Sequence, residues 1–212
     1  MASAMGFCLY QNILKGAINT MEFKEIVARN RSYRGYDESR KVTKDELEYL
    51  VDCARLTASG MNALPFCFHI AYEQEELDLI QPLTKWGAAL PDIALPHDGK
   101  CPTAFIVICQ DKEVSDNLQN FRTDLGITAQ TICLGATAIG LGGCMIANFN
   151  KEVLHQQLGL PEQYQPILLV AVGKPDEEVV IKEIDKGEST RYYRDSNDVH
   201  YVPKRKLKDI LI

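Results

Sequence analysis

The residues best suited to chemistry in this chain begin with a cationic cluster near its start. Arg29, Arg31 and Arg34 fall within six residues, and Ser32 lies between them. A guanidinium offers planar, bidentate hydrogen bonds that match a phosphate group, and a serine hydroxyl adds a directional contact. The cluster therefore predicts a phosphate site, with a solvated basic loop as the alternative.

A second basic cluster lies close to the C-terminus, at Lys204, Arg205, Lys206 and Lys208. The chain as a whole is acidic, with a net charge of −6. Basic clusters at both distant ends of an acidic protein suggest that the two meet around one anion; a solvated helix start is the alternative for the second. The overall acidity argues against a nucleic-acid partner, because neutralising phosphates requires a basic surface.

A third segment, residues 59–65, reads Ser-Gly-Met-Asn-Ala-Leu-Pro. Gly60 permits close approach of the backbone to a ligand. Asn62 supplies both a donor and an acceptor for the edge of a heterocycle. Taken alone, the segment also fits an ordinary turn.

Other candidate sites are not supported by the sequence. The histidines are far apart, and none pairs at metal-ligand spacing with another histidine or a cysteine, so no metal site is predicted; they are His69, His97, His155 and His200. The glycine-rich run 140–143 follows a predicted helix, which is the wrong context for a dinucleotide fingerprint or a P-loop. Cys144 has no evident base and is interpreted as a small buried hydrophobe.

Hydrophobic periodicity predicts the helices that must position these segments. A short helix is expected over 22–29, and the capping box Thr43–Glu46 opens another. The longest helical pattern, 124–141, is apolar on nearly all sides. Such a helix is expected in the middle of a structure or at an oligomer interface. A further helix from Lys151 is expected to end before Gly159.

Three compact apolar runs predict buried strands over 66–72, 103–109 and 166–173. Without repeats or an interdomain linker, we expect one α+β domain over 21–212, preceded by an N-terminal extension, 1–20. No run approaches the roughly 18 apolar residues of a membrane span. The seven cysteines are dispersed and lack CxxC spacing, which predicts a reduced, cytoplasmic protein.

In this order the segments resemble the nitroreductase family of flavoproteins. The resemblance runs from about Phe23 to the C-terminus and rests on four stretches: 31–36 (Arg-Ser-Tyr-Arg-Gly-Tyr), 58–65 (the family's Pro-Ser-x-x-Asn-x-Gln-Pro), 138–146 (a glycine-leucine-glycine helix end) and 200–205 (a basic tail). The chain departs from the family where Asn30 replaces an additional arginine of many members. It also has Ala58 for proline, Leu64 for glutamine, and Ala147 where some members place glutamate.

The resemblance implies a nitroreductase-like α+β fold with a central, mostly antiparallel sheet flanked by helices, forming an intertwined homodimer with two FMN sites at its interface. Arg31, Ser32 and Arg34 of one subunit would hold the phosphate, the ribityl chain and the pyrimidine edge. From the other subunit, Ala58, Gly60 and Asn62 would approach the flavin. Met145, Ile146 and Ala147 would line one face of the flavin. Lys204 and Arg205 would complete the phosphate site.

The implied reaction is hydride transfer from NADH or NADPH to flavin N5, followed by reduction of a small acceptor such as a nitroaromatic or a quinone. The cofactor carries this chemistry, so no catalytic side chain is expected. Two alternatives stay open. One is a specialised relative of the dehalogenase or flavin-cleaving type, with the 74–100 region as a lid. The other is an FMN-binding protein without physiological turnover.

Overall fold

The computed structural model describes residues 22–212, so the predicted extension 1–20 lies outside it. Its centre is a four-stranded sheet in the order β1 (Phe66–Ala71), β2 (Ala104–Asp111), β4 (Tyr164–Gly173), β3 (Gly142–Ile146). Each neighbouring pair is antiparallel. The three predicted strands correspond to β1, β2 and β4, with ends that differ by at most two residues.

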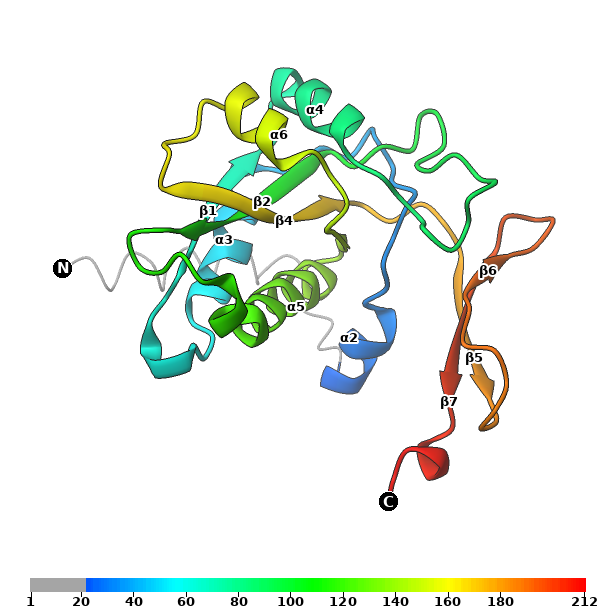
Figure 1. Cartoon of the computed structure of the whole chain (residues 1–212). Helices are drawn as coiled ribbons and strands as arrows, with labels where there is room; N and C mark the ends of the chain where they lie inside the picture. The colour runs from blue at the N-terminus through cyan, green and yellow to red at the C-terminus, as the bar shows by residue number, and fades with distance from the viewer. Residues whose placement is uncertain (1–21) are drawn as a thin grey trace.

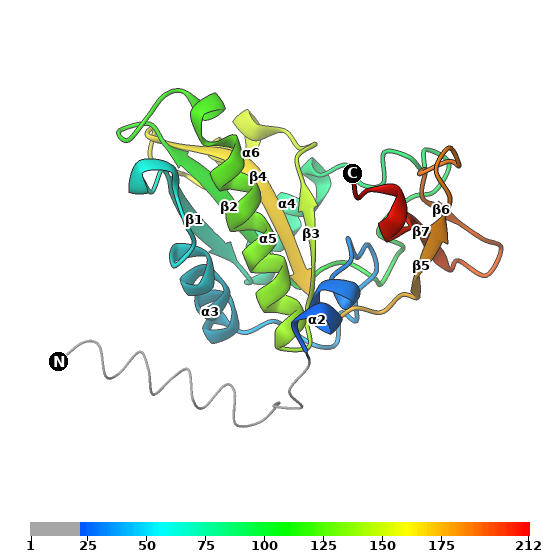
Figure 2. The same ribbon diagram turned by 90° about the horizontal axis from the view of Figure 1, so that it is seen from below.

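Helices cover both faces of this sheet (Figures 1 and 2). On one face lie α3 (Lys44–Arg55) and α5 (Arg122–Ala138), and on the other lie α4 (Gln74–Ile80) and α6 (Lys151–Gln157). The alternation of side chains along β2 builds both cores, since Ile106 and Ile108 pack toward α3 and α5 while Phe105 and Val107 pack toward α4 and α6. The predicted α+β class, with a mostly antiparallel sheet flanked by helices, is confirmed.

Local signals explain where several helices begin and end. The capping box of α3 is confirmed, because the Thr43 amide donates to Glu46 Oε2 at 2.9 Å and the Glu46 amide donates to Thr43 Oγ1 at 3.3 Å. Gly159, with φ +59°, follows α6. The short α2 (Phe23–Arg29) packs on α5. Four 3₁₀ turns complete the helical elements of residues 22–212: Gly60–Asn62, Gln81–Leu83, Leu118–Phe121 and Leu207–Asp209.

A second, three-stranded sheet lies beside the main sheet and its helices, as Figure 1 shows. Its strand order is β5 (Val179–Ile184), β7 (His200–Arg205), β6 (Tyr193–Arg194). β5 and β7 are parallel, and β6 and β7 are antiparallel. Of the basic cluster, Lys204 and Arg205 therefore belong to a strand, whereas Lys206 precedes, and Lys208 lies in, the 3₁₀ turn Leu207–Asp209, as the helix-start alternative expected. The predicted helix 124–141 also ends early, at Ala138, because the chain turns through Gly140 (φ +80°) into β3.

Within the described residues, no helix is both long enough and apolar enough to cross a membrane.

Candidate functional site

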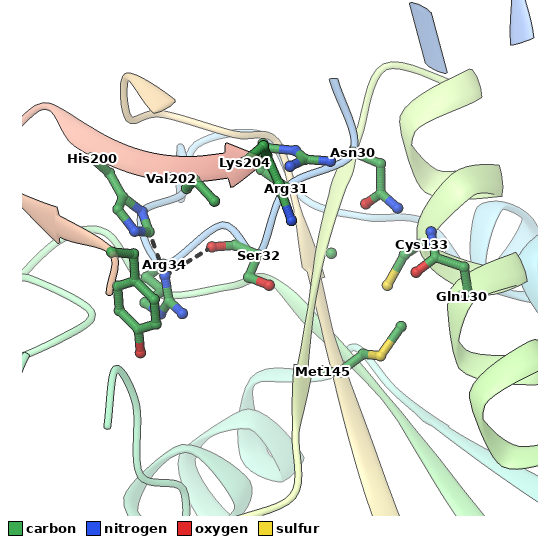
Figure 3. A pocket seen from close by; sticks show the side chains of 12 residues that line it. Asn30, Arg31, Ser32, Arg34, Gln130, Cys133, Met145, His200, Val202 and Lys204 are labelled. Carbon is green, nitrogen blue, oxygen red and sulfur yellow. Dashed lines mark hydrogen bonds between the residues drawn. The ribbon is translucent and has the colours of Figure 1, made fainter. Parts of the chain in front are cut away.

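A cavity of about 300 Å³ lies where the 30–34 segment, α5, β3 and β7 meet. This volume is within the range of small-molecule and cofactor sites. Figure 3 shows Arg31 and Lys204 on the β7 side and Gln130 and Cys133 on the α5 side. The lining residues are Asn30, Arg31, Ser32, Arg34, Gln130, Cys133, Gly143, Met145, Tyr192, His200, Val202 and Lys204.

Backbone pairing places the 30–34 segment against β3. Ser32 forms a parallel bridge with Gly143, and the Tyr33 amide donates to the Gly143 carbonyl at 3.3 Å. Little room is left between the two segments, because a Cβ built on Gly142 would lie 2.5 Å from the Tyr33 ring. The first arginine cluster is therefore held on the rim of the main sheet.

The second basic cluster reaches the same cavity through β7. Alternate residues of a strand share a face, and His200, Val202 and Lys204 all line the cavity. Arg205, one residue on, is exposed and is not among the lining residues. The structure thus brings Arg31 and Lys204 together from opposite ends of the chain and leaves the predicted cofactor contact of Arg205 without support.

Arg34 is the most enclosed of these cations, with 8% of its surface exposed. Its Nη1 donates to the Ser32 carbonyl at 3.2 Å and lies 3.4 Å from His200 Nδ1. The guanidinium carbon stands 4.8 Å from the centre of the Tyr192 ring, a cation–π contact. The Arg34 amide donates to the Glu177 carboxylate, which also pairs with the buried Arg194 side chain. Arg34 is therefore fixed along its whole length.

His200 is 2% exposed and stands close to two guanidiniums. Its burial, together with the positive charges of Arg34 and Arg194, lowers the pKa of the imidazole to about 4. At neutral pH the ring is therefore uncharged, and its Nδ1 can accept a hydrogen bond from Arg34. Its Nε2 is buried and has no partner among the described residues.

The positive charge of the cavity is not neutralised from within the described part of the chain. Over residues 22–212, no carboxylate forms an ion pair with Arg31, Arg34 or Lys204. Arg31 Nη2 donates to the Val27 carbonyl at 3.0 Å, whereas its Nε is buried and has no partner within residues 22–212. Burial lowers the pKa of Arg31, although an arginine stays protonated at neutral pH. This donor set fits an anionic ligand.

The thiols near the cavity are poor nucleophiles. Burial raises the pKa of Cys133, on the cavity wall, to about 12 and that of Cys144 to about 11. A thiol needs its thiolate form to attack, so neither is suited to covalent catalysis. Residues 22–212 also contain no group of three or more histidine, cysteine, aspartate or glutamate side chains able to hold a metal ion.

The 58–64 segment lies away from this cavity. Buried Asp124 accepts hydrogen bonds from Ser59 Oγ at 2.7 Å and from the Gly60 amide at 2.8 Å. Asp124 is six residues before Gln130, or about 9 Å along the axis of α5. Ala58, Gly60 and Asn62 are therefore not brought to the cavity of their own chain, and their predicted contact with a cofactor in a partner's site stays a prediction.

Of the three residues predicted to line one flavin face, only Met145 lines the cavity. Ile146 points to the opposite face of β3, where it packs in the core beside α4 and α6. Ala147 is exposed beyond the end of β3. The segment 138–146 was interpreted as the end of a helix, and its strand alternation separates Met145 from Ile146; flavin contacts of Ile146 and Ala147 stay a prediction.

Several lining residues were not predicted as site residues. His200 had a signal, since it precedes Lys204 by four residues on what proves to be a strand. Tyr192 had none, because its place depends on how the segment 185–200 connects the parallel strands β5 and β7. Gln130 and Cys133 are on α5, whose apolar pattern indicated burial and not a binding surface.

Comparisons with known proteins give one consistent result. The model of the nitroreductase family matches residues 27–174. A protein of Archaeoglobus fulgidus, named provisionally as an NADH dehydrogenase/NAD(P)H nitroreductase, is 25% identical over 169 residues, which cover 77% of this chain and 91% of that protein. A Bacillus subtilis protein, YdgI, provisionally named an NAD(P)H nitroreductase, is 24% identical over 192 residues, with 76% and 92% covered.

Solved structures agree with these sequence matches. An FMN-dependent nitroreductase of Clostridium difficile R20291 is 27% identical with a TM-score of 0.57, covering 72% of this chain and 87% of its own. A provisionally named nitroreductase of Exiguobacterium sibiricum, solved in complex with FMN, shares the fold with a TM-score of 0.62 at 20% identity, with 74% and 90% covered.

Proposed function

This chain belongs to the nitroreductase family, and we propose that it is an FMN-dependent oxidoreductase that uses NADH or NADPH to reduce a small acceptor such as a nitroaromatic or a quinone. The observation that carries the proposal is the cavity lined by Arg31, Arg34 and Lys204 with no carboxylate paired to them among the described residues. The names of the relatives, and the FMN dependence of the C. difficile protein, support the same assignment.

The residues of the cavity suit the parts of FMN. Arg31 and Lys204 would neutralise its phosphate, and the Ser32 hydroxyl would add a directional hydrogen bond. The orphaned Nε of Arg31 is a buried donor that such an anion would satisfy. Met145 and Gly143 offer apolar and backbone surface on the β3 side. The site thus combines charge at one place with a largely uncharged wall at another.

When bound, FMN supplies the redox chemistry, accepting a hydride at N5 and passing reducing equivalents on. Arg34 would face the pyrimidine edge of the ring system. Because its guanidinium is already fixed by the Ser32 carbonyl and the Tyr192 ring, it can stabilise negative charge there without first reorganising. No side-chain base or nucleophile is assigned, in keeping with the raised pKa of Cys133.

We propose further that the active form is a homodimer. The strip of α5 that includes Gly126, Ile127 and Gln130 is exposed in the single chain, with Ile127 37% exposed. The segment 58–64 is bound to Asp124 at the start of α5, next to this strip, where a partner chain could use Asn62. If α5 packed against α5 of the partner in a two-fold symmetric dimer, the exposed strip would be covered, and each segment 58–64 could reach one of two equivalent sites.

Titration with FMN tests the cofactor and the motif together. Arg31→Ala should weaken FMN binding by on the order of 2–4 kcal/mol if the guanidinium pairs with phosphate in a partly buried site. Arg31→Lys should recover only part of that loss, because bidentate geometry is missing. Arg29→Ala is the matched control, since Arg29 carries the same charge two residues away but is exposed and paired with Glu25. A wild-type protein that binds no FMN would refute the proposal, as would equal effects of the Arg29 and Arg31 changes.

Turnover separates an enzyme from a passive flavin carrier. The absorption of bound FMN near its visible maximum should bleach when NADH or NADPH is added anaerobically, and should return when a quinone or nitroaromatic acceptor is supplied. A flavin that stays oxidised in the presence of both nucleotides would favour the FMN-binding protein without turnover.

Complementation between chains tests the homodimer. If Arg34→Ala and Asn62→Ala are each inactive, mixed dimers should contain one doubly altered site and one intact site. With random pairing after co-refolding, half of the dimers are mixed and half of their sites are intact, so about a quarter of wild-type activity should return. A mixture as inactive as its parents would show that each site is built within one chain.

A further inference from the structure

The loop that leads from α4 to β2, residues 84–100, is fastened to the segment 185–200, which joins β5 to β7 in the small sheet and includes β6. Figures 1 and 2 both show this loop beside the β6 end of the small sheet. Ala89 is held at both of its backbone polar groups: its amide donates to the Tyr192 hydroxyl at 3.1 Å, and its carbonyl accepts from Arg191 Nη2 at 2.9 Å. A third tie joins His97 Nε2 to the Asp198 carboxylate at 3.1 Å.

The same loop touches the arginine of the proposed cofactor site. A Cβ built on Gly87 would lie 3.9 Å from Arg34 Cδ, so the loop backbone passes close to the Arg34 stem. The Tyr192 ring covers the guanidinium at 4.8 Å, and the edge-on contact between Tyr192 and His200, 5.4 Å between ring centres, holds that ring in place. Tyr192 therefore contacts Arg34 through its ring and the loop through its hydroxyl.

We infer that Tyr192 is a positioning residue that fixes Arg34 and the 84–100 loop relative to each other. The ring holds the guanidinium at one place in the cavity. The hydroxyl holds Ala89, and it thereby also holds the loop that packs on the Arg34 stem. This inference rests on the proposed FMN site for its consequence in redox chemistry, but not for the tie between Tyr192 and the loop.

The two halves of the inference can be separated by substitution. Tyr192→Phe keeps the ring and removes the hydroxyl, so the Ala89 amide loses its acceptor while the cation–π contact remains. Amides of residues 86–95 should then exchange with deuterium at least several times faster in the FMN-free protein, with FMN affinity close to that of the wild type. Tyr192→Leu removes both contacts, so the loop should exchange faster and FMN should dissociate about tenfold more readily.

The two-electron potential of bound FMN gives an independent readout. Reduction adds negative charge to the flavin, which a fixed guanidinium stabilises. With Arg34 less ordered in Tyr192→Leu, the potential should become more negative, whereas in Tyr192→Phe it should stay at the wild-type value. A residue with a merely structural role would lower thermal stability without separating these two variants.

Tyr193→Leu is the matched control. Tyr193 is the next residue along the chain and the first of β6, but it stacks on Tyr201 at 5.1 Å and lines a different depression, together with Lys182 and Pro203. Its replacement should change neither loop exchange nor FMN affinity.

Equal behaviour of the Tyr192→Leu and Tyr193→Leu variants would overturn the inference, as would wild-type loop exchange and wild-type FMN affinity in Tyr192→Leu. If the wild-type protein binds no FMN, the proposed function fails, and loop exchange in Tyr192→Phe still decides whether Tyr192 holds the loop.

Discussion

The buried histidine beside Arg34 makes the stability of the fold depend on pH in a direction that can be stated in advance. His200 has a pKa of about 4 in the folded chain, against 6.5 for an ordinary histidine, because it is buried and faces Arg34 and Arg194. At mildly acidic pH the His200 imidazole is therefore protonated in the unfolded chain but not in the folded chain. Its contribution to stability is fully present above pH 6.5 and is lost as the pH falls toward 4.

The magnitude follows from the two pKa values. A shift from 6.5 to about 4 corresponds to a change of about 3 kcal/mol in the free energy of unfolding between a pH well above 6.5 and a pH well below 4. Between pH 7.5 and pH 5 the linkage relation gives a loss of about 2 kcal/mol in the free energy of unfolding. Most of this change falls above the range in which ordinary carboxylates titrate, which helps to isolate the histidine.

Denaturation with urea measures the effect, using FMN-free protein at one chain concentration and a series of pH values. His200→Gln is the comparison, because a glutamine carbonyl can accept from Arg34 Nη1 but does not titrate. The wild type should lose about 2 kcal/mol more than the variant between pH 7.5 and pH 5. Parallel profiles for the two proteins would refute the reasoning and would mean that His200 can be protonated in the folded chain without cost.

Three further predictions concern positions outside the titrating cluster. Asp124→Ala should lower the free energy of unfolding by about 2–3 kcal/mol, because it removes an acceptor that serves two donors. Asp116→Ala, at an exposed position, should leave the free energy of unfolding almost unchanged, and equal losses for the two variants in urea denaturation would contradict this prediction. Gly142→Ala should destabilise by about 1–3 kcal/mol, since its Cβ would meet the Tyr33 ring at 2.5 Å, and an unchanged melting curve would show that the contact relaxes. Iodoacetamide at pH 8 should leave Cys133 unmodified in the folded protein and should modify it in urea, because burial raises the pKa of this thiol to about 12. Peptide mass spectrometry records the modification, and rapid labelling of the folded chain would show that the thiol is not buried in this way.

The main sheet and its helices were predictable because their signals are local. The capping box of α3 is complete within four residues, and β1, β2 and β4 are compact apolar runs, of which β2 and β4 are buried on both faces and β1 is a half-buried edge strand. β3 was missed because Gly142 and Gly143 carry no β propensity. Its strand conformation comes from pairing with β4 and from the close approach of Tyr33, which no local pattern reveals.

The candidate site was predictable only in its charged part. Arg31 and Lys204 could be paired from the sequence because uncompensated cations imply a shared anion, and both line the cavity. The enclosure of Arg34 could not be predicted. Tyr192 and His200 reach it through the small sheet, whose strands are short and whose register depends on tertiary contacts.

The balance of charge also explains how the chain can carry Asn30 where many relatives have an additional arginine. Glu177, a carboxylate of this network, is already engaged by the Arg34 amide and by Arg194, and it forms no ion pair with a cation of the cavity within residues 22–212. A phosphate monoester carries a charge of about −1.5 to −2 at neutral pH, which two cations match. Arg31 and Lys204 would supply them, leaving Arg34 for the pyrimidine edge. Asn30, only 9% exposed, then serves the cavity as a neutral hydrogen-bonding wall, where a further guanidinium would add a buried charge without a partner.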